Sequence, residues 1–207
     1  MWVHTKESQD KIKPSHALGF LKEGNIRFLN NLKIDRNLLT QVNQTSEGQF
    51  PFATVLSCID SRTSAELIFN QGLGDIFSIR IAGNIINDDI LGSMEYSCDI
   101  ANSKIIMVLG HTKCGAIISA CNKIKTGHLT GLLNKIKPAI DKEVSTKVNR
   151  TGHNYTFVSN VSIINVQLII KQIRDQSLIL NKMENEGKIL IVGGLYDIDS
   201  GMVTFFD

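Results

Sequence analysis

Four short apolar runs along the chain have the length and composition of buried strands. They lie at residues 52–57, 76–81, 104–109 and 188–192, and polar or glycine-containing segments bound each of them. Apolar runs of roughly four to eight residues with β-branched members are typical of strands buried on both faces. The longer segments that separate or follow them have apolar residues at helical spacing, at 63–69, 88–101, 115–125, 129–151 and 155–186.

Strands that alternate with helices predict an α/β fold. We expect a mainly parallel central sheet of about four strands, with helices on both faces. A C-terminal antiparallel strand is expected to close a hairpin that turns at residues 199–201. We expect a single domain over residues 1–207, with an N-terminal helical arm at 1–35 and an α/β core at 50–207.

Local patterns predict where several elements begin and end. Residues 15–32 predict one or two short helices broken near Gly24, and the polar segment 33–51 predicts a loop. Thr63 and Glu66 have the spacing of a capping box at the start of a helix.

Composition narrows the class of protein. Hydrophobic residues make up 43% and charged residues 20% of the chain, as in a globular protein with a substantial core. The net charge is +2 and the basic residues are scattered, which argues against nucleic acid or an anionic membrane as the main partner. The longest apolar stretch, 161–170, is interrupted by polar residues and is too short to span a bilayer. Residues 1–7 do not resemble a signal peptide, so we expect a cytoplasmic protein.

Two of the predicted strands end in polar loops that contain candidate metal ligands. Cys58 follows the first strand, and His111 and Cys114 follow the third. Ligands of open α/β sheets bind beyond the carboxyl ends of the strands, so the two loops can meet if these strands are neighbours. Two thiolates and an imidazole suit zinc and leave a fourth position for water or substrate. The alternative on spacing alone is a polar loop with incidental cysteines.

Adjacent residues strengthen the candidate site. The Asp60 carboxylate could coordinate the metal or accept a hydrogen bond from its water, and the planar guanidinium of Arg62 could hold that carboxylate. The alternative is a surface ion pair of little energetic worth. The helix that opens at Gly115 is expected to point its amino end toward the site, which favours the thiolate of Cys114.

The remaining motifs have structural explanations. Cys98 and Cys121 lie in amphipathic helical segments, where a buried free thiol is expected. Gly110 and Gly115 have the spacing of a phosphate-binding loop, but Ala116 and Ile117 stand where Lys and Ser or Thr are required, so nucleotide binding is unsupported.

Cys58-x-Asp60-Ser61-Arg62 followed by His111-x-x-Cys114 resembles the signature of the β-class carbonic anhydrases. Similarity extends over most of the chain, at residues 21–25, 80–84, 196–197 and 201–203. The resemblance implies a lyase that reversibly hydrates carbon dioxide to bicarbonate and a proton by attack of zinc-bound hydroxide.

The same resemblance implies the roles of the site residues. One zinc ion per subunit would be held by Cys58, His111 and Cys114, with Asp60 and Arg62 as the catalytic dyad. The family also shows a closed state in which the aspartate becomes the fourth zinc ligand, and Asp60 is placed to do so.

A plant-like substrate pocket is also implied. Gln49, Phe77 and Tyr96 stand at the matching positions, with Gly115 beside the ligands. Another branch of the family has a Trp three residues before the first Cys and is inhibited by bicarbonate. Val55 stands there, which argues against this regulation.

The resemblance further implies a homodimer or a larger homo-oligomer, with the N-terminal helices wrapped around a neighbouring subunit. Two other functions are compatible with the same ligands. One is a related zinc hydrolase that acts on a sulfur analogue of carbon dioxide, and the other is a non-catalytic zinc-binding or redox protein.

Overall fold

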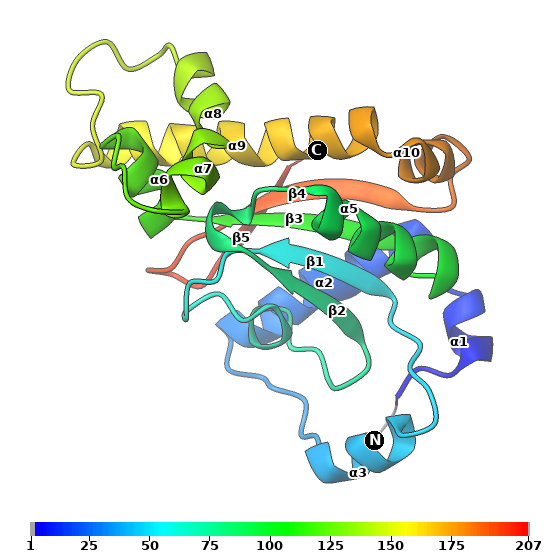
Figure 1. Ribbon diagram of the computed structural model, residues 1–207. Helices are drawn as coiled ribbons and strands as arrows, with labels where there is room; N and C mark the ends of the chain where they lie inside the picture. Colours follow the sequence, from blue (N-terminus) through cyan, green and yellow to red (C-terminus); the bar gives the residue numbers. More distant parts are fainter. Residues whose placement is uncertain (1–2, 207) are drawn as a thin grey trace.

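The computed structural model describes residues 3–206 and shows an α/β protein built on one sheet (Figure 1). Within these residues the sheet has five strands in the order β2-β1-β3-β4-β5. The first four pair in parallel and β5 pairs antiparallel with β4, which confirms the predicted fold class. The strands span Ala53–Ser57 (β1), Ile76–Arg80 (β2), Ile105–His111 (β3), Leu190–Tyr196 (β4) and Val203–Phe206 (β5).

Helices cover both faces of the sheet. The long helix α9 lies across β3 and β4, and α2 lies on the opposite face (Figure 1). The α-helices span Lys6–Asp10 (α1), Pro14–Leu29 (α2), Leu38–Thr45 (α3), Ala65–Ile68 (α4), Asp88–Glu95 (α5), Gly115–Cys121 (α6), Leu129–Asn134 (α7), Lys137–Lys142 (α8), Tyr155–Gln176 (α9) and Leu178–Asn185 (α10). A 3₁₀ turn spans Ala82–Asn84 (η1), and a π-helical turn, Tyr96–Ile100 (η2), extends α5.

The central strand β3 is buried on both faces, which explains its uninterrupted apolar sequence. Met107 belongs to a core cluster that contains Leu21 of α2. Its neighbour Val108 points to the other face and belongs to a cluster that contains Val166 of α9. Side chains alternate between the faces of a strand, so one apolar run supplies two cores.

The pairing of β1 with β3 positions the candidate site. Ser57, the last residue of β1, is opposite Leu109 of β3 in the parallel register. Cys58 therefore leaves the sheet next to the end of β3, where His111 lies. The two predicted ligand loops emerge at the same edge of the sheet.

The predicted break near Gly24 is wrong, because α2 continues through this residue. A Cβ atom on Gly24 would lie 1.8 Å from the carbonyl oxygen of Phe69, so the missing side chain allows the helix to contact the backbone after α4. The neighbouring Asn25 is buried and donates hydrogen bonds to the carbonyl oxygens of Ile68 (3.2 Å) and Gly201 (3.0 Å). Gly24 therefore marks a packing contact rather than a helix end.

Three other local predictions need correction. The predicted loop 33–51 contains α3, whose first turn is capped by Asn37 accepting from the amide of Thr40 at 3.0 Å. The segment 129–151 forms two short helices, α7 and α8, followed by an irregular stretch. The glycines at 193–194 lie inside β4 rather than beyond it.

The predicted helix 155–186 divides at Ser177 into α9 and α10. The Ser177 hydroxyl accepts from the amide of Leu180 at 3.1 Å and donates to Glu95 at 2.6 Å. A side chain that caps a helix and bonds a distant element stops the preceding helix. Helical periodicity alone does not reveal that second bond.

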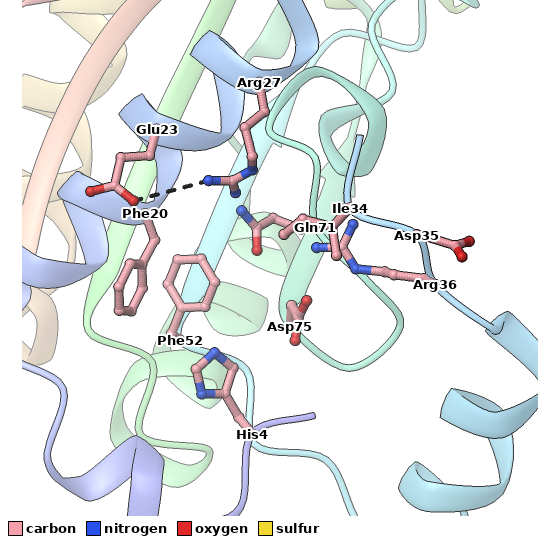
Figure 2. A pocket seen from close by; sticks show the side chains of 10 residues that line it. All are labelled: His4, Phe20, Glu23, Arg27, Ile34, Asp35, Arg36, Phe52, Gln71 and Asp75. Carbon is pink, nitrogen blue, oxygen red and sulfur yellow. Dashed lines mark ion pairs between the residues drawn. The ribbon is translucent and has the colours of Figure 1, made fainter. Parts of the chain in front are cut away.

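A cavity of about 470 Å³ lies beside α2 and the start of β1 (Figure 2). Phe20, Phe52 and His4 lie together on one side of it, with the His4 and Phe52 ring centroids 5.6 Å apart. Arg27 and Arg36 lie on the other side, and three carboxylates also line the cavity. Its lining therefore contains more carboxylates than arginines.

The described residues contain no helix that is long and apolar enough to cross a membrane.

The packing of α2 gives a direct test. We expect Gly24→Ala to lower the free energy of unfolding by about 1–3 kcal/mol, because the new methyl group overlaps the Phe69 carbonyl. Gly19 is on the same helix with open space around it, so Gly19→Ala should raise stability by about 0.5–1 kcal/mol through helix propensity. Urea unfolding of both variants measures the difference. Equal effects would contradict the close contact at Gly24.

Candidate metal centre

Cys58, His111 and Cys114 form a buried cluster at the carboxyl edge of the sheet. One nitrogen or sulfur atom of each lies within 4.8 Å of the other two, and the sulfur atoms of the cysteines are 3.9 Å apart. The three residues are no more than 4% exposed. Cys58 directly follows β1, His111 is the last residue of β3, and Cys114 is the N-cap of α6. The structure thus brings together the three residues that the sequence predicts as ligands.

The His111 ring is oriented toward the cluster by one backbone contact. Its Nδ1 lies 2.9 Å from the carbonyl oxygen of Thr112, to which it donates a hydrogen bond. The other nitrogen, Nε2, is buried and has no hydrogen-bond partner among the described residues. A buried polar atom without a partner is costly, and metal-ligating histidines commonly donate through their second nitrogen in this way. The orphaned Nε2 therefore fits a metal ion between the two sulfurs.

The electrostatics of the two cysteines differ. Contacts of the Cys58 sulfur with the Cys114 thiol, then with the His111 ring, and more weakly with the Gly83 amide at 3.4 Å hold the pKa of Cys58 well below its usual range. The pairing with Cys58, and then burial, raise the pKa of Cys114, so the pair favours the thiolate at Cys58 and not at Cys114 as the sequence predicted. The pair therefore shares one proton between two close sulfurs. A cation in the cluster can replace that proton, and thiolates then suit a soft divalent metal.

Asp60 and Arg62 form the predicted pair beside the cluster. Arg62 donates from Nε to Oδ1 (2.9 Å) and from Nη2 to Oδ2 (2.7 Å), and its backbone amide also donates to Oδ1 (3.0 Å). Hydrogen bonds from the Arg62 side chain, followed by its backbone amide, hold the pKa of Asp60 well below its usual range. The Asp60 side chain is only 16% exposed. A charged, oriented acceptor therefore stands beside the cluster.

Thr63 does not form the predicted capping box, because α4 begins after Ser64. Its hydroxyl instead bonds the carbonyl oxygens of Cys58 (3.1 Å) and Asp60 (2.9 Å), which closes the first ligand loop. The sequence pattern located a real hydrogen-bonding residue but assigned it to the wrong partner.

Arg80 is a further residue of the site, to which the sequence assigned no role. Its Nε donates to the carbonyl oxygen of Cys58 at 3.1 Å and its Nη2 to that of Asp60 at 2.6 Å. Arg80 ends β2 opposite Ser57, and this register brings it beside the loop. Arg80 belongs to the family-like segment 80–84 that the sequence shows. Its role could not be predicted, because its partners are backbone carbonyl groups, which every residue type has.

The second ligand loop is held by the hairpin between β4 and β5. The Thr112 amide donates to the Tyr196 carbonyl at 2.9 Å, and the Thr112 hydroxyl donates to Asp197 at 3.0 Å. Lys113 forms an ion pair with Asp199 at 2.6 Å. The C-terminal hairpin therefore fixes the carbonyl group that orients His111.

The residues predicted to line a substrate pocket are dispersed within one chain. Gln49 is exposed in the segment before β1. Phe77 and Tyr96 have ring centroids 6.3 Å apart and line a cavity of about 640 Å³ that none of the three candidate metal ligands lines. Gly115 directly follows Cys114, and a Cβ atom there would meet open space. The assignment of these four residues to a substrate pocket remains a prediction.

A buried Cys–His–Cys cluster at the carboxyl edge of a parallel sheet, beside an ionised Asp–Arg pair, is the architecture of an α/β metalloenzyme. The carbonic anhydrase family model matches residues 53–203. The chain therefore belongs to the carbonic anhydrase family, as the resemblance predicted, and is an enzyme of that family.

Individual relatives agree with this assignment. Carbonic anhydrase 2 of Mycobacterium tuberculosis is 31% identical over 195 residues, which cover 94% of this chain and 93% of the relative. The carbonic anhydrase of Mycolicibacterium smegmatis is 30% identical, with 92% of each chain covered. The solved β-carbonic anhydrase CafA of Aspergillus fumigatus has the same fold, with a TM-score of 0.72, 24% identity, and coverage of 93% of this chain and 90% of that chain.

The contacts of Arg80 predict an effect on metal affinity. We expect Arg80→Gln to weaken cobalt(II) binding about tenfold, because the carbonyl groups of the first ligand loop lose their brace. Titration monitored by thiolate-to-metal absorption measures it. Arg174 hydrogen bonds to Glu184 and Ile191, away from both ligand loops, so Arg174→Gln is the matched control. Equal affinities in the two variants would show that Arg80 does not support the site.

Proposed function

We propose that the protein catalyses the zinc-dependent, reversible hydration of carbon dioxide to bicarbonate and a proton. One observation carries the proposal: the buried cluster of Cys58, His111 and Cys114, with an imidazole nitrogen that has no partner among the described residues. Membership of the carbonic anhydrase family supports this reaction over other uses of a Cys–His–Cys site.

The donor set suits zinc, with one ion per chain held by Cys58, His111 and Cys114. When bound there, zinc lowers the pKa of a water molecule and so supplies the nucleophile, although two thiolates should leave that pKa higher than three histidines would. The hydrogen bond from His111 to the Thr112 carbonyl keeps a proton on Nδ1, which leaves Nε2 as the ring atom that faces the metal position. Gly83 stabilises charge on the Cys58 sulfur through its amide.

Asp60 is the residue that orients the reaction. Arg62 keeps its carboxylate ionised, so that one carboxylate oxygen accepts a hydrogen bond from the attacking water and turns the oxygen lone pair toward carbon dioxide. Release of the Arg62 contact would free Asp60 to become a fourth metal ligand, which would block the reaction. The structure has the paired arrangement.

A homodimer is the minimum unit that we propose, in a cytoplasmic enzyme. Gln49, Phe77 and Tyr96 would then line the substrate pocket together with residues of a second copy. Exposed apolar side chains on α2 and α3 support burial against such a copy; they include Ile26 (57% exposed), Leu38 (56%) and Leu39 (71%). Two β-carbonic anhydrases of Sordaria macrospora that share this fold are tetrameric.

Metal content and turnover test the proposal together. We expect the wild-type protein to bind about one zinc ion per chain and to hydrate carbon dioxide in stopped flow well above the buffer rate. Cys58→Ser removes a ligand, so zinc content and hydration should fall together. Cys98 lies in η2 and is buried in a core cluster that contains none of the candidate ligands, so Cys98→Ser should retain both. Bound zinc without hydration would favour a non-catalytic protein, and faster turnover of a sulfur analogue would favour the related hydrolase.

The Asp60→Asn variant distinguishes a role of Asp60 in orienting the attacking water from a role in metal binding. We expect turnover to fall about 100-fold with zinc retained, because the amide is uncharged and binds the attacking water less well. Zinc analysis and stopped-flow hydration of the same sample measure the two effects. Loss of zinc in this variant would instead make Asp60 mainly structural.

A further inference from the structure

A further cavity is lined by residues from the end of α6, from α7 and α8, and from the irregular segment that follows α8. Figure 1 shows where these elements lie, near the start of α9. Its volume is about 590 Å³, within the roughly 300–1,000 Å³ typical of small-molecule sites. None of the candidate metal ligands or of the predicted substrate-pocket residues lines it. The proposed hydration reaction therefore gives this cavity no role.

The inner wall of the cavity is apolar. Ala120 and Cys121 come from the last turn of α6, and Leu133 comes from α7; each is less than 8% exposed. Ile124 and Ile140 line the sides. Burial raises the pKa of the Cys121 thiol to about 11, so this side chain is uncharged at neutral pH and adds to the apolar wall. Such a wall favours a ligand with a hydrocarbon or aromatic body.

One cation at the cavity is rigidly held. The Arg150 guanidinium donates to Glu143 at 2.5 Å and to the carbonyl oxygens of Ile140 (2.7 Å) and Thr146 (3.0 Å). It also lies 4.6 Å from the centroid of the Phe157 ring. Glu143 is 1% exposed, and its charge balances that of Arg150. The Arg150–Glu143 pair holds the segment after α8 in place as one wall of the cavity. Because the two charges cancel, the net charge of the cavity depends on other residues.

Lysines at the rim provide that charge. Lys137 pairs with Asp141 at 2.9 Å, whereas Lys123 and Lys125 form no ion pair within the described part of the chain. Lys123 has a φ of 56° because it ends α6 in a Schellman turn, in which its amide donates to the carbonyl oxygen of Ala120 and the amide of Ile124 donates to that of Ser119. The cavity combines an apolar wall with two unbalanced positive charges.

We propose that this cavity binds a small soluble organic anion, a carboxylate with an apolar body. The body would contact Ala120, Cys121 and Leu133, and the anionic group would be paired by Lys123 and Lys125 at the rim. The cavity in Figure 2 does not have this property, because three carboxylates line it together with two arginines. The two cavities therefore differ in their charge, and only the cavity beside α6 is complementary to an anion.

Fluorescence of 8-anilinonaphthalene-1-sulfonate, an anion with an aromatic body, tests the proposal on the intact protein. We expect saturable binding of about one dye per chain. Octanoate should displace the dye, whereas octanamide, which lacks the charge, and acetate, which lacks the apolar body, should displace it at least fivefold less effectively. Equal displacement by octanamide and octanoate would overturn the role of the lysines.

Two variants locate the site. Lys123→Gln/Lys125→Gln should weaken dye binding at least fivefold. Lys33→Gln/Lys171→Gln, which removes two exposed lysines elsewhere, should leave it within twofold. Ala120→Phe should fill the cavity and abolish binding, with near-ultraviolet circular dichroism to confirm folding. Equal affinity in the two lysine variants, or undiminished binding to a folded Ala120→Phe protein, would overturn the proposal.

Discussion

The parallel pairing of β1 with β3 is the constraint on which the rest of the molecule depends. Its register places the end of β1 beside the end of β3, so that Cys58 meets His111 and Cys114 across more than fifty residues of sequence. Both strands are buried on both faces, and a shift of register would expose core residues as well as separate the ligands. The same burial that stabilises the sheet therefore fixes the metal centre.

Hydrogen bonds to backbone groups hold the two ligand loops that follow β1 and β3. Arg80 and Thr63 hold the carbonyl groups of the first ligand loop, and the C-terminal hairpin holds Thr112, whose carbonyl orients His111. The two ligand loops are thus held by β2 and by the C-terminal hairpin, which come from different parts of the chain. This arrangement brings an unpartnered imidazole nitrogen and two sulfur atoms within reach of one metal ion.

Much of this arrangement could be predicted from the sequence, because it follows from local patterns. Apolar runs gave the strands of the parallel sheet, and the residue types after two of them gave the three candidate ligands. The Asp60–Arg62 pair was predictable because its two members lie two residues apart.

The remainder depends on contacts between distant segments. Gly24 predicts a helix break from the sequence alone, because the contact with the Phe69 carbonyl that requires a glycine is visible only in the structure. Ser177 ends a helix within a periodic segment, and its hydrogen bond to Glu95 is not visible in the sequence. Arg80 donates to backbone carbonyl groups, whose positions cannot be predicted from residue types. Gln49, Phe77 and Tyr96 are dispersed in one chain, so the common role predicted for them requires a second copy, which the sequence does not place.

X-ray absorption at the zinc edge of the purified protein tests the central claim most directly. A shell of two sulfur atoms near 2.3 Å, with one imidazole nitrogen and one further light atom near 2.0–2.1 Å, is the expected result. A shell of four sulfur atoms, or one without sulfur, would contradict a centre built from Cys58, His111 and Cys114.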